Sequence, residues 1–186
     1  LVHGVTDYAI YMLDKDGRVA NWNAGAERAK GYTADEIIGE DFGRFYSEEE
    51  RAAGLPQRAL LKARTEGKFE AEGKRFRKDG TSFWAHVVID PIWGAEGEIA
   101  GYAKITKDVT EQKADRDRIK EVSRNLDLAL ENVSQGICLF DAEERLVLAN
   151  RRYSEIFEFE QGTIRPGMSY KEIIAIGYEI HFSDPE

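Results

Sequence analysis

The sequence predicts an α+β fold, in which an antiparallel sheet carries short helices on one face and a long helix leads to a partial second copy of the same unit. Two strand-like runs joined by a turn come first, and three more follow a series of short helical segments. A helical stretch without Gly or Pro comes after them. This order indicates strands paired through short turns, with the helices gathered on one face, rather than alternating βα units.

The first two strands are expected at residues 8–13 and 18–23. The turn Asp14-Lys-Asp-Gly17 joins them, and Gly17 can adopt the positive φ that such a turn requires. Residues 24–31 are expected to form a short helix that ends at its glycine, because glycine adopts the left-handed conformation without steric cost.

Two capping boxes, Thr33-Ala-Asp-Glu36 and Ser47-Glu-Glu-Glu50, predict the starts of the next helices. In such a box the hydroxyl of the first residue and the carboxylate of the fourth each accept a hydrogen bond from the other's backbone amide. A longer helix is expected over residues 57–66. Three strand-like runs joined by glycine-containing turns complete the sheet, and they are residues 68–77, 81–92 and 98–107.

The last of these strands continues directly into a helix. Asp108 is placed to cap this helix, because a short carboxylate accepts a hydrogen bond from the amide three residues on, and Glu111 can return the bond. A strand that continues as a helix can pass a small displacement of the sheet along that helix. We therefore expect Asp108, Thr110 and Glu111 to form a signal relay.

The helix over residues 110–133 is expected to be a linker that dimerises as a coiled coil. Its apolar residues recur at intervals of three and four, as at the a and d positions of two heptads. They are Ile119, Val122, Leu126, Ala129 and Val133. The alternative is an amphipathic helix packed on its own domain. The strongly polar first turns argue against burial there and favour the linker.

The chain then repeats itself at an offset of 127 residues, the difference between Ile10 and Ile137. The same offset relates Asp14, Arg18 and Asn23 to Asp141, Arg145 and Asn150. The repeat has no counterpart of residues 68–108, so we interpret it as an incomplete copy. The expected organisation is a first domain at 1–109, a helical linker at 110–133 and half of a second domain at 134–186.

Composition excludes several classes of function. The net charge of −9 without a dense basic patch argues against nucleic-acid binding, because phosphate contacts need clustered Lys and Arg. The single cysteine, Cys138, excludes an internal disulfide and a multi-cysteine zinc site. No apolar run approaches the roughly 20 residues of a membrane helix. We expect a soluble, cytoplasmic fragment of a longer protein.

With these motifs the chain resembles a PAS sensor domain with its C-terminal PAC motif, followed by an incomplete second PAS domain. The matching segments are Asn23-Ala-Gly-Ala-Glu-Arg28, Gly31-Tyr32, Glu36-Ile-Ile-Gly39, Arg77-Lys-Asp-Gly80, Phe83-Trp84, Asp90-Pro91-Ile92 and Asp108-Val-Thr-Glu111. The resemblance implies a five-stranded antiparallel sheet whose concave face holds any ligand, and an Asp-x-Thr segment that couples the sheet to the output helix. It does not specify the ligand, because PAS domains bind haem, flavins, organic acids or nothing.

Comparison with light-sensing PAS domains implies which side chains line the pocket. The expected set is Phe45, Leu61, Phe69, Arg75, Ala85, Val87, Ile89, Lys104 and Thr106. Arg75 and Lys104 near an apolar pocket would attract a carboxylate or phosphate, so a small anionic ligand is one hypothesis. In the alternative these cations pair with acidic residues inside the domain, as buried charges generally must.

The resemblance also bears on the cofactor, which we treat as unknown. Haem-binding PAS domains of the oxygen-sensor type carry an axial His on the long helix, and residues 47–66 contain none, which argues against haem. The flavin photosensors carry a reactive Cys where this chain has Phe42, so no covalent flavin adduct is expected. His86 is expected to face outward, and Cys138 to pack in the core of the second copy.

The function that the resemblance favours is the sensory input module of a cytoplasmic sensor histidine kinase, in a two-component phosphorelay. The alternatives are the input region of a cyclic di-GMP cyclase or phosphodiesterase, and a PAS dimerisation module without a ligand. The fragment itself is not expected to be an enzyme, because no nucleophile–base or metal constellation is present. A homodimer through the linker helix and the PAS faces is expected.

Overall fold

The computed structural model describes residues 8–160 and 162–182, apart from the side chains of residues 181 and 182. The ends of the predicted domains at residues 1 and 186 lie outside this range. The chain forms two compact units that meet between Arg116 and Asp117, and each unit is described by itself. No helix within the described ranges is both long and apolar enough to cross a membrane.

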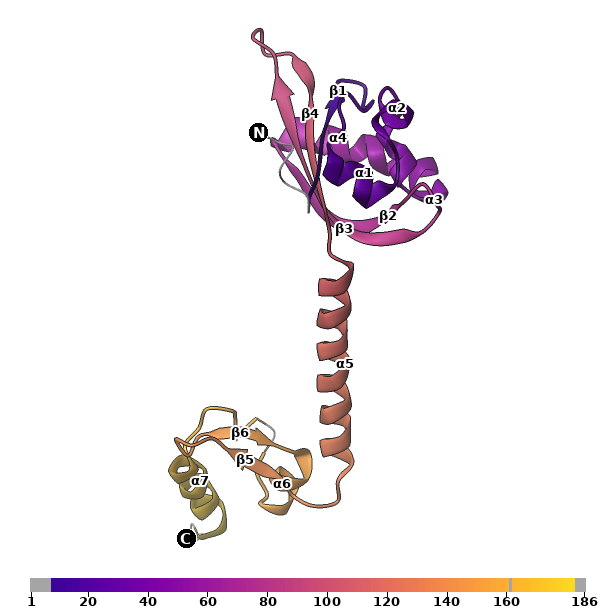
Figure 1. The fold of residues 1–186 in the computed structure, drawn as a ribbon. Coiled ribbons are helices and arrows are strands. Elements are labelled where there is room, and N and C mark those ends of the chain that lie inside the picture. The colour runs from indigo at the N-terminus through magenta and orange to yellow at the C-terminus, as the bar shows by residue number, and fades with distance from the viewer. Residues whose placement is uncertain (1–7, 161, 183–186) are drawn as a thin grey trace. The chain divides into compact units, whose positions relative to one another are not determined.

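The first unit contains an antiparallel sheet with the strand order β1-β4-β3-β2 (Figure 1). Its strands are β1 (Tyr8–Asp14), β2 (Phe69–Phe76), β3 (Ser82–Trp93) and β4 (Ile99–Asp108). Alternate side chains of β3 are buried, and the registers place Ile89 opposite Lys104 of β4 and Phe69 of β2. This arrangement confirms the predicted α+β class.

The structure corrects one predicted strand, because residues 18–23 form only isolated bridges, which include Leu13 to Val19. The sheet of the described residues therefore has four strands instead of five. Asparagine side chains take the place of the missing ladder: the Oδ1 atoms of Asn21 and Asn23 accept hydrogen bonds from the amides of Met12 and Ile10. Side-chain amides of this kind compete with backbone pairing.

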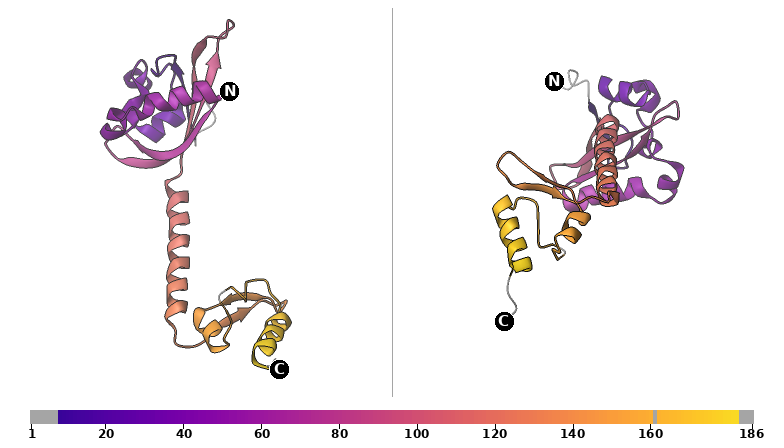
Figure 2. Two further views of the ribbon diagram at one scale, coloured as in Figure 1. Left: turned by 180° about the vertical axis from the view of Figure 1, so that it is seen from behind. Right: turned by 90° about the horizontal axis from the view of Figure 1, so that it is seen from below.

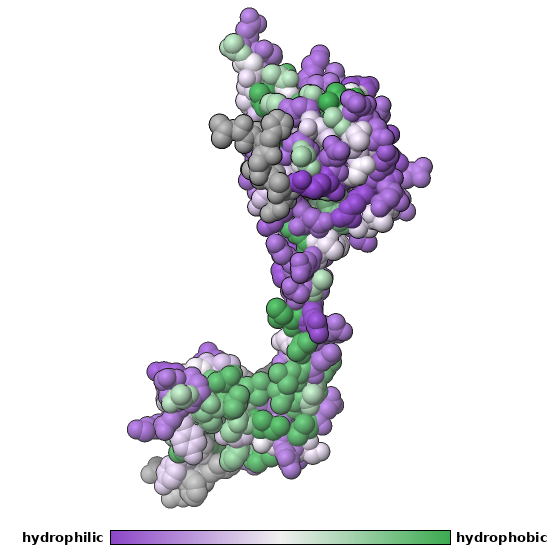
Figure 3. Space-filling view, viewed as in Figure 1, coloured by the Kyte–Doolittle hydropathy of each residue, from purple (hydrophilic) through white to green (hydrophobic). Residues whose placement is uncertain are grey.

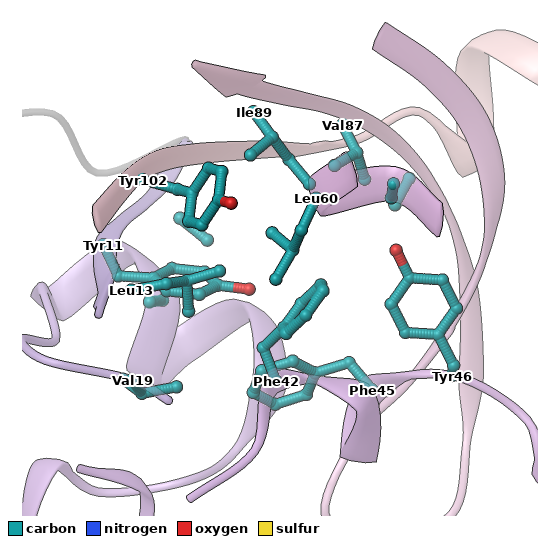
Figure 4. Packing of buried hydrophobic residues seen from close by; sticks show 14 of the residues in the cluster. Tyr11, Leu13, Val19, Phe42, Phe45, Tyr46, Leu60, Val87, Ile89 and Tyr102 are labelled. Carbon is teal, nitrogen blue, oxygen red and sulfur yellow. The ribbon is translucent and has the colours of Figure 1, made fainter. Parts of the chain in front are cut away.

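Five short helical segments lie on one face of this sheet (Figures 1 and 2). They are α1 (Ala24–Lys30), α2 (Ala34–Ile37), the 3₁₀ segment η2 (Phe42–Phe45), α3 (Glu48–Ala52) and α4 (Leu55–Glu66). Both predicted capping boxes, which open α2 and α3, are present. Side chains from β1, η2 and α4 meet the inward side chains of β3 and β4 in an aromatic-rich core (Figure 4).

The long helix α5 spans Thr110–Asn132 and follows β4 after one residue. Its first turns contact the sheet, because Arg116 donates hydrogen bonds to Glu72 of β2 and the Nζ atom of Lys113 lies 4.6 Å from the ring centroid of Trp84. No residue of α5 is buried. The first unit thus extends two turns beyond the sheet.

The second unit repeats the start of the first. It contains β5 (Cys138–Phe140), β6 (Leu146–Ala149), α6 (Arg151–Ile156) and α7 (Tyr170–Phe182). The Oδ1 atom of Asn150 accepts from Ile137 and Tyr153, just as that of Asn23 accepts from Ile10 and Ala26. The buried core is small, and apolar residues lie on the surface of this unit (Figure 3).

Candidate functional site

The interior of the first unit brings most of the predicted pocket residues together. Phe45, Val87 and Ile89 are fully buried (Figure 4). Ala85 is fully buried as well, and Phe69 packs against the same core. The polar members, Arg75, Lys104 and Thr106, are buried as well. The alternation predicted for β3 and β4 is therefore the one observed, and three polar groups share the interior with the apolar core.

Leu61 is the exception, because its side chain is 59% exposed and the prediction that it lines the pocket is wrong. The buried face of α4 consists of Pro56, Ala59, Leu60 and Ala63, with the spacing of one side of a helix. Leu60 therefore occupies the interior position, and its neighbour points to solvent.

Arg75 and Lys104 have no acidic partner within the described residues. The guanidinium carbon of Arg75 lies 3.8 Å from the ring centroid of Tyr46, and Nη1 donates to the carbonyl of Lys74. The Nζ atom of Lys104 lies 5.2 Å from the ring centroid of Phe42 and has no hydrogen-bond partner. Pairing with acidic residues, the alternative interpretation of these cations, is therefore not what holds them.

Lys30, at the end of α1, is a third buried cation that sequence reasoning missed. Its Nζ atom lies 4.1 Å from the ring centroid of Phe45 and 5.3 Å from that of Phe83, and it has no hydrogen-bond partner in the part of the chain that the structure describes. Burial, followed by the charges of Arg75 and Arg77, lowers the pKa of Lys30 to about 7. Its place in the last turn of a helix had no apolar spacing that would have marked it as interior.

The other cations and the hydroxyls of the interior have perturbed pKa values too. Burial lowers the pKa of Lys104 well below its ordinary value, with further contributions from Arg75 and Lys30. Burial raises the pKa of Tyr11 and of Tyr46 above the ordinary tyrosine value. The interior thus favours neutral lysines and neutral tyrosines while no counter-ion is present.

A cleft of about 430 Å³ between α4 and β2 reaches this interior. Tyr46, Ala59, Gly73 and Arg75 are among its lining residues. Gly73 makes room for the arginine, because a Cβ atom at that position would lie 3.0 Å from Nη1 of Arg75. Lys104 is not part of the lining and lies further from solvent.

The joint between β4 and α5 is held by Asp108 and Thr110. The Oδ1 atom of Asp108 accepts hydrogen bonds from the amide of Thr110 at 3.0 Å and from its hydroxyl at 2.6 Å, and that hydroxyl accepts from the amide of Trp84 at 3.0 Å. This pattern corrects the predicted capping box, because Asp108 bonds two residues on rather than three. Glu111 makes no return bond among the described residues, since Val109 occupies the cap position and donates to Trp84.

Arg77 connects this joint to α1. It donates from Nη2 to Oδ2 of Asp108 at 2.7 Å and from Nε to the carbonyl of Ala29 at 3.0 Å. The carbonyl of Lys30 accepts from the amide of Lys78 at 2.9 Å. The end of α1 that carries the buried lysine is therefore bonded to the same arginine that holds the start of α5.

The remaining candidates lie elsewhere. His86 points away from the core, and its Nε2 atom lies 2.8 Å from Oε1 of Glu70. Cys138 is partly buried against the core of the second unit. No cluster of three or more His, Cys, Asp or Glu residues that could hold a metal ion occurs in the part of the chain that the structure describes.

Comparison with protein families supplies two matches. The model of a family described as PAS domain matches residues 7–111, and one described as PAS fold matches residues 130–181. A PAS domain of a protein from Colwellia psychrerythraea shares the fold with a TM-score of 0.53 and 25% identity, over 57% of this chain and 92% of that one. An RNA-binding light-oxygen-voltage receptor matches with a TM-score of 0.54 and 24% identity, over 66% of this chain and 35% of that one.

Two relatives are much longer proteins. Two-component system protein A of Emericella nidulans is 51% identical over 113 residues, which are 61% of this chain and 16% of that protein. Oxygen sensor protein DosP of Escherichia coli is 27% identical over 152 residues, which are 80% of this chain and 18% of that protein. The chain therefore spans less than a fifth of either relative.

Proposed function

This chain belongs to the PAS domain family, and from that premise we propose that it is the sensory input module of a larger cytoplasmic two-component signalling protein whose output is a histidine kinase. The name of the Emericella nidulans relative supports the two-component assignment. Enzyme activity on this proposal belongs to the whole protein. Within the fragment, residues 1–109 are the sensor, residues 110–133 the linker, and residues 134–186 part of a second PAS domain.

The joint between β4 and α5 is the observation that carries this proposal. A change in the interior of the sensor, such as occupancy by a small anion held by Arg75 and Lys104, displaces the sheet. Asp108 and Thr110 bind the end of β4, the amide of Trp84 in β3 and the first turn of α5 together. The displacement therefore moves the start of α5, which biases the register of the linker.

We propose that the linker acts as a dimer with a second copy of this chain. The apolar stripe of α5 is exposed, with exposures of 70% for Ile119, 61% for Val122 and 56% for Leu126. Intervals of three and four residues are those of a two-stranded coiled coil. In a dimer the two stripes cover each other, and a rotation of one helix changes the contacts of both.

The test is to compare Asp108→Asn with Glu111→Gln in the full-length protein. Asparagine removes the charge paired with Arg77, whereas Glu111 lies in the first turn of α5 and its side chain makes no hydrogen bond among the described residues. ATP-dependent autophosphorylation is expected to change about fivefold or more in Asp108→Asn, as for a coupling of about 1 kcal/mol, and to stay near the wild-type rate in Glu111→Gln. Circular dichroism checks that both variants fold.

Two outcomes contradict the proposal. A wild-type protein that does not phosphorylate itself rejects the histidine kinase output. Equal rates for both variants and the wild type reject the joint as the point of transmission.

A further inference from the structure

We propose that the interior of the first unit binds a small dianion, a dicarboxylate or a phosphate, between Lys30, Arg75 and Lys104. This inference rests on the proposed sensory function, because it names the ligand class of the same interior. It adds Lys30, which had no place in the predicted pocket. A third cation changes the expected ligand from any small anion to one with at least two negative charges.

The three cationic groups converge on one turn of the chain. Lys104 lies over the ring of Phe42, and Lys30 lies over the ring of Phe45, both within η2. Arg75 lies over the ring of Tyr46, the residue that follows η2. The rings of Phe42 and Tyr46 are 5.8 Å apart between centroids. Residues from α1, β2 and β4 thus bring their charged ends to the same part of the core.

In their charged forms Lys30 and Lys104 lack the partner that a buried charge requires. An aromatic face stabilises a desolvated cation by less than the burial of that ion costs. The Nζ atoms of Lys30 and Lys104 have no hydrogen-bond partner in the described residues, whereas the buried hydroxyl of Tyr11 interacts with Thr106 and that of Tyr46 with Arg75. Donors of both kinds are what the oxygens of a carboxylate or phosphate accept from.

The cleft between α4 and β2 gives the anion a route to this site. Its volume of about 430 Å³ falls in the range of ligand pockets, about 300–1,000 Å³. Arg75 lines the cleft, and its charge acts on both lysines. The cleft is also lined by the charged residues Glu50, Arg58, Lys62 and Glu72, and Arg75 is the buried cation among its lining residues. A dianion held by Arg75 can draw the two amines toward it.

Binding of the dianion should be accompanied by proton uptake. The groups whose charges act on the two lysines are Arg75 for both, Lys30 for Lys104, and Arg77 and Asp108 for Lys30. With a pKa of about 7, Lys30 is largely neutral above that pH in the empty site, and a bound dianion favours its ammonium form. Affinity is therefore expected to fall as the pH rises above about 7.

The experiment uses residues 1–186 with succinate and inorganic phosphate as probes, and acetate and chloride at matched ionic strength as controls. Thermal unfolding is followed by tryptophan fluorescence, which reports on the first unit because Trp22, Trp84 and Trp93 all lie there. A probe whose free concentration is about 100 times its dissociation constant should raise the midpoint temperature of unfolding by about 5–10 °C. Comparison of succinate with phosphate identifies which kind of dianion is preferred.

Variants then test the site itself. Lys104→Met and Lys30→Met should each weaken the dianion's binding about 10- to 100-fold, since each removes a charged hydrogen-bond donor. Lys107→Met, on the same strand but facing outward, should bind as the wild type does. Calorimetric titration in buffers of different ionisation enthalpy should detect proton uptake above about pH 7, and less of it in Lys30→Met.

The proposal is overturned if neither dianion shifts the midpoint, if acetate shifts it equally, or if both buried-lysine variants respond as the wild type does. Any of these results leaves the relay untouched if Asp108→Asn still changes autophosphorylation of the full-length protein. If the dianion binds but Asp108→Asn leaves autophosphorylation unchanged, the proposed function is rejected and the ligand site is retained.

Discussion

Substitution of Lys30 by Met should remove a defined part of the pH dependence of stability. The unfolded chain keeps a proton on this amine up to its ordinary pKa of 10.5, whereas the folded protein releases it above about pH 7. The folded state therefore binds fewer protons in this window. The free energy of unfolding consequently rises with pH between the two values, because a depressed lysine pKa opposes folding most strongly at low pH.

The magnitude follows from the width of the window. One proton bound only by the unfolded state changes the free energy of unfolding by about 1.4 kcal/mol per pH unit. Over the interval from about 7 to 10.5 the total is about 5 kcal/mol. Methionine is nearly as long as lysine but carries no charge. The free energy of unfolding of Lys30→Met should therefore exceed that of the wild type most below about pH 7, by up to about 5 kcal/mol minus any loss of packing.

Urea unfolding of residues 1–186, followed by tryptophan fluorescence between about pH 6 and pH 9, measures this difference. The excess stability of Lys30→Met should shrink by about 1.4 kcal/mol for each pH unit above about 7. Lys104 contributes with the same sign in both proteins, and its contribution is smaller in Lys30→Met because the charge of Lys30 helps to lower the pKa of Lys104. The exposed Lys74→Met serves as the control and should parallel the wild type. Parallel profiles for Lys30→Met and the wild type would refute a buried, depressed lysine.

Three further substitutions test other parts of the structure. Thr110→Val removes two hydrogen bonds and should lower the free energy of unfolding by about 1–2 kcal/mol. Thr110→Ser keeps the hydroxyl and should lower it by less than about 0.5 kcal/mol. Equal losses in the two variants would contradict the hydrogen bonds of the joint. Leu60→Ala should cost about 2–4 kcal/mol in urea unfolding, and the exposed Leu61→Ala under about 1. Leu126→Asp should halve the particle mass that light scattering measures, because a charge in the apolar stripe separates the dimer. Asn125→Asp, outside the stripe, should leave that mass unchanged. An unchanged mass in Leu126→Asp rejects the linker dimer.

Much of the fold follows from the sequence because its signals are local. The capping boxes at Thr33 and Ser47 form as predicted, and the period-two pattern of β3 places Ala85, Val87 and Ile89 inward. The repeat at an offset of 127 residues reappears in the bonds of Asn23 and Asn150. The caps and the strand pattern depend on residues a few positions apart, and the repeat is read by comparing the sequence with itself, so pattern alone is sufficient for these features.

The errors arise where tertiary contacts decide. The side chains of Asn21 and Asn23 replace a strand's backbone bonds, which residue type alone does not reveal. Whether Leu60 or Leu61 faces the core depends on the rotation of α4 about its axis. The sequence does not mark Lys30 as interior because a lysine near a helix end usually points to solvent, and here tertiary packing against Phe45 and Phe83 buries it.

Arg77 connects the buried cations to the joint between β4 and α5, because its charge acts on Lys30 and its guanidinium donates to Asp108. This connection gives the interior a physical means to act on α5. Asp108 raises the pKa of Lys30, and Arg77 lowers it, so the charge on Lys30 in turn favours the carboxylate and opposes the guanidinium. A dianion beside Lys30 would favour its ammonium form. The new charges at Lys30 and at the anion would then act on Arg77, which holds both the carbonyl of Ala29 and Asp108. The empty and occupied interiors therefore differ in energy at the bonds that fix the start of the helix.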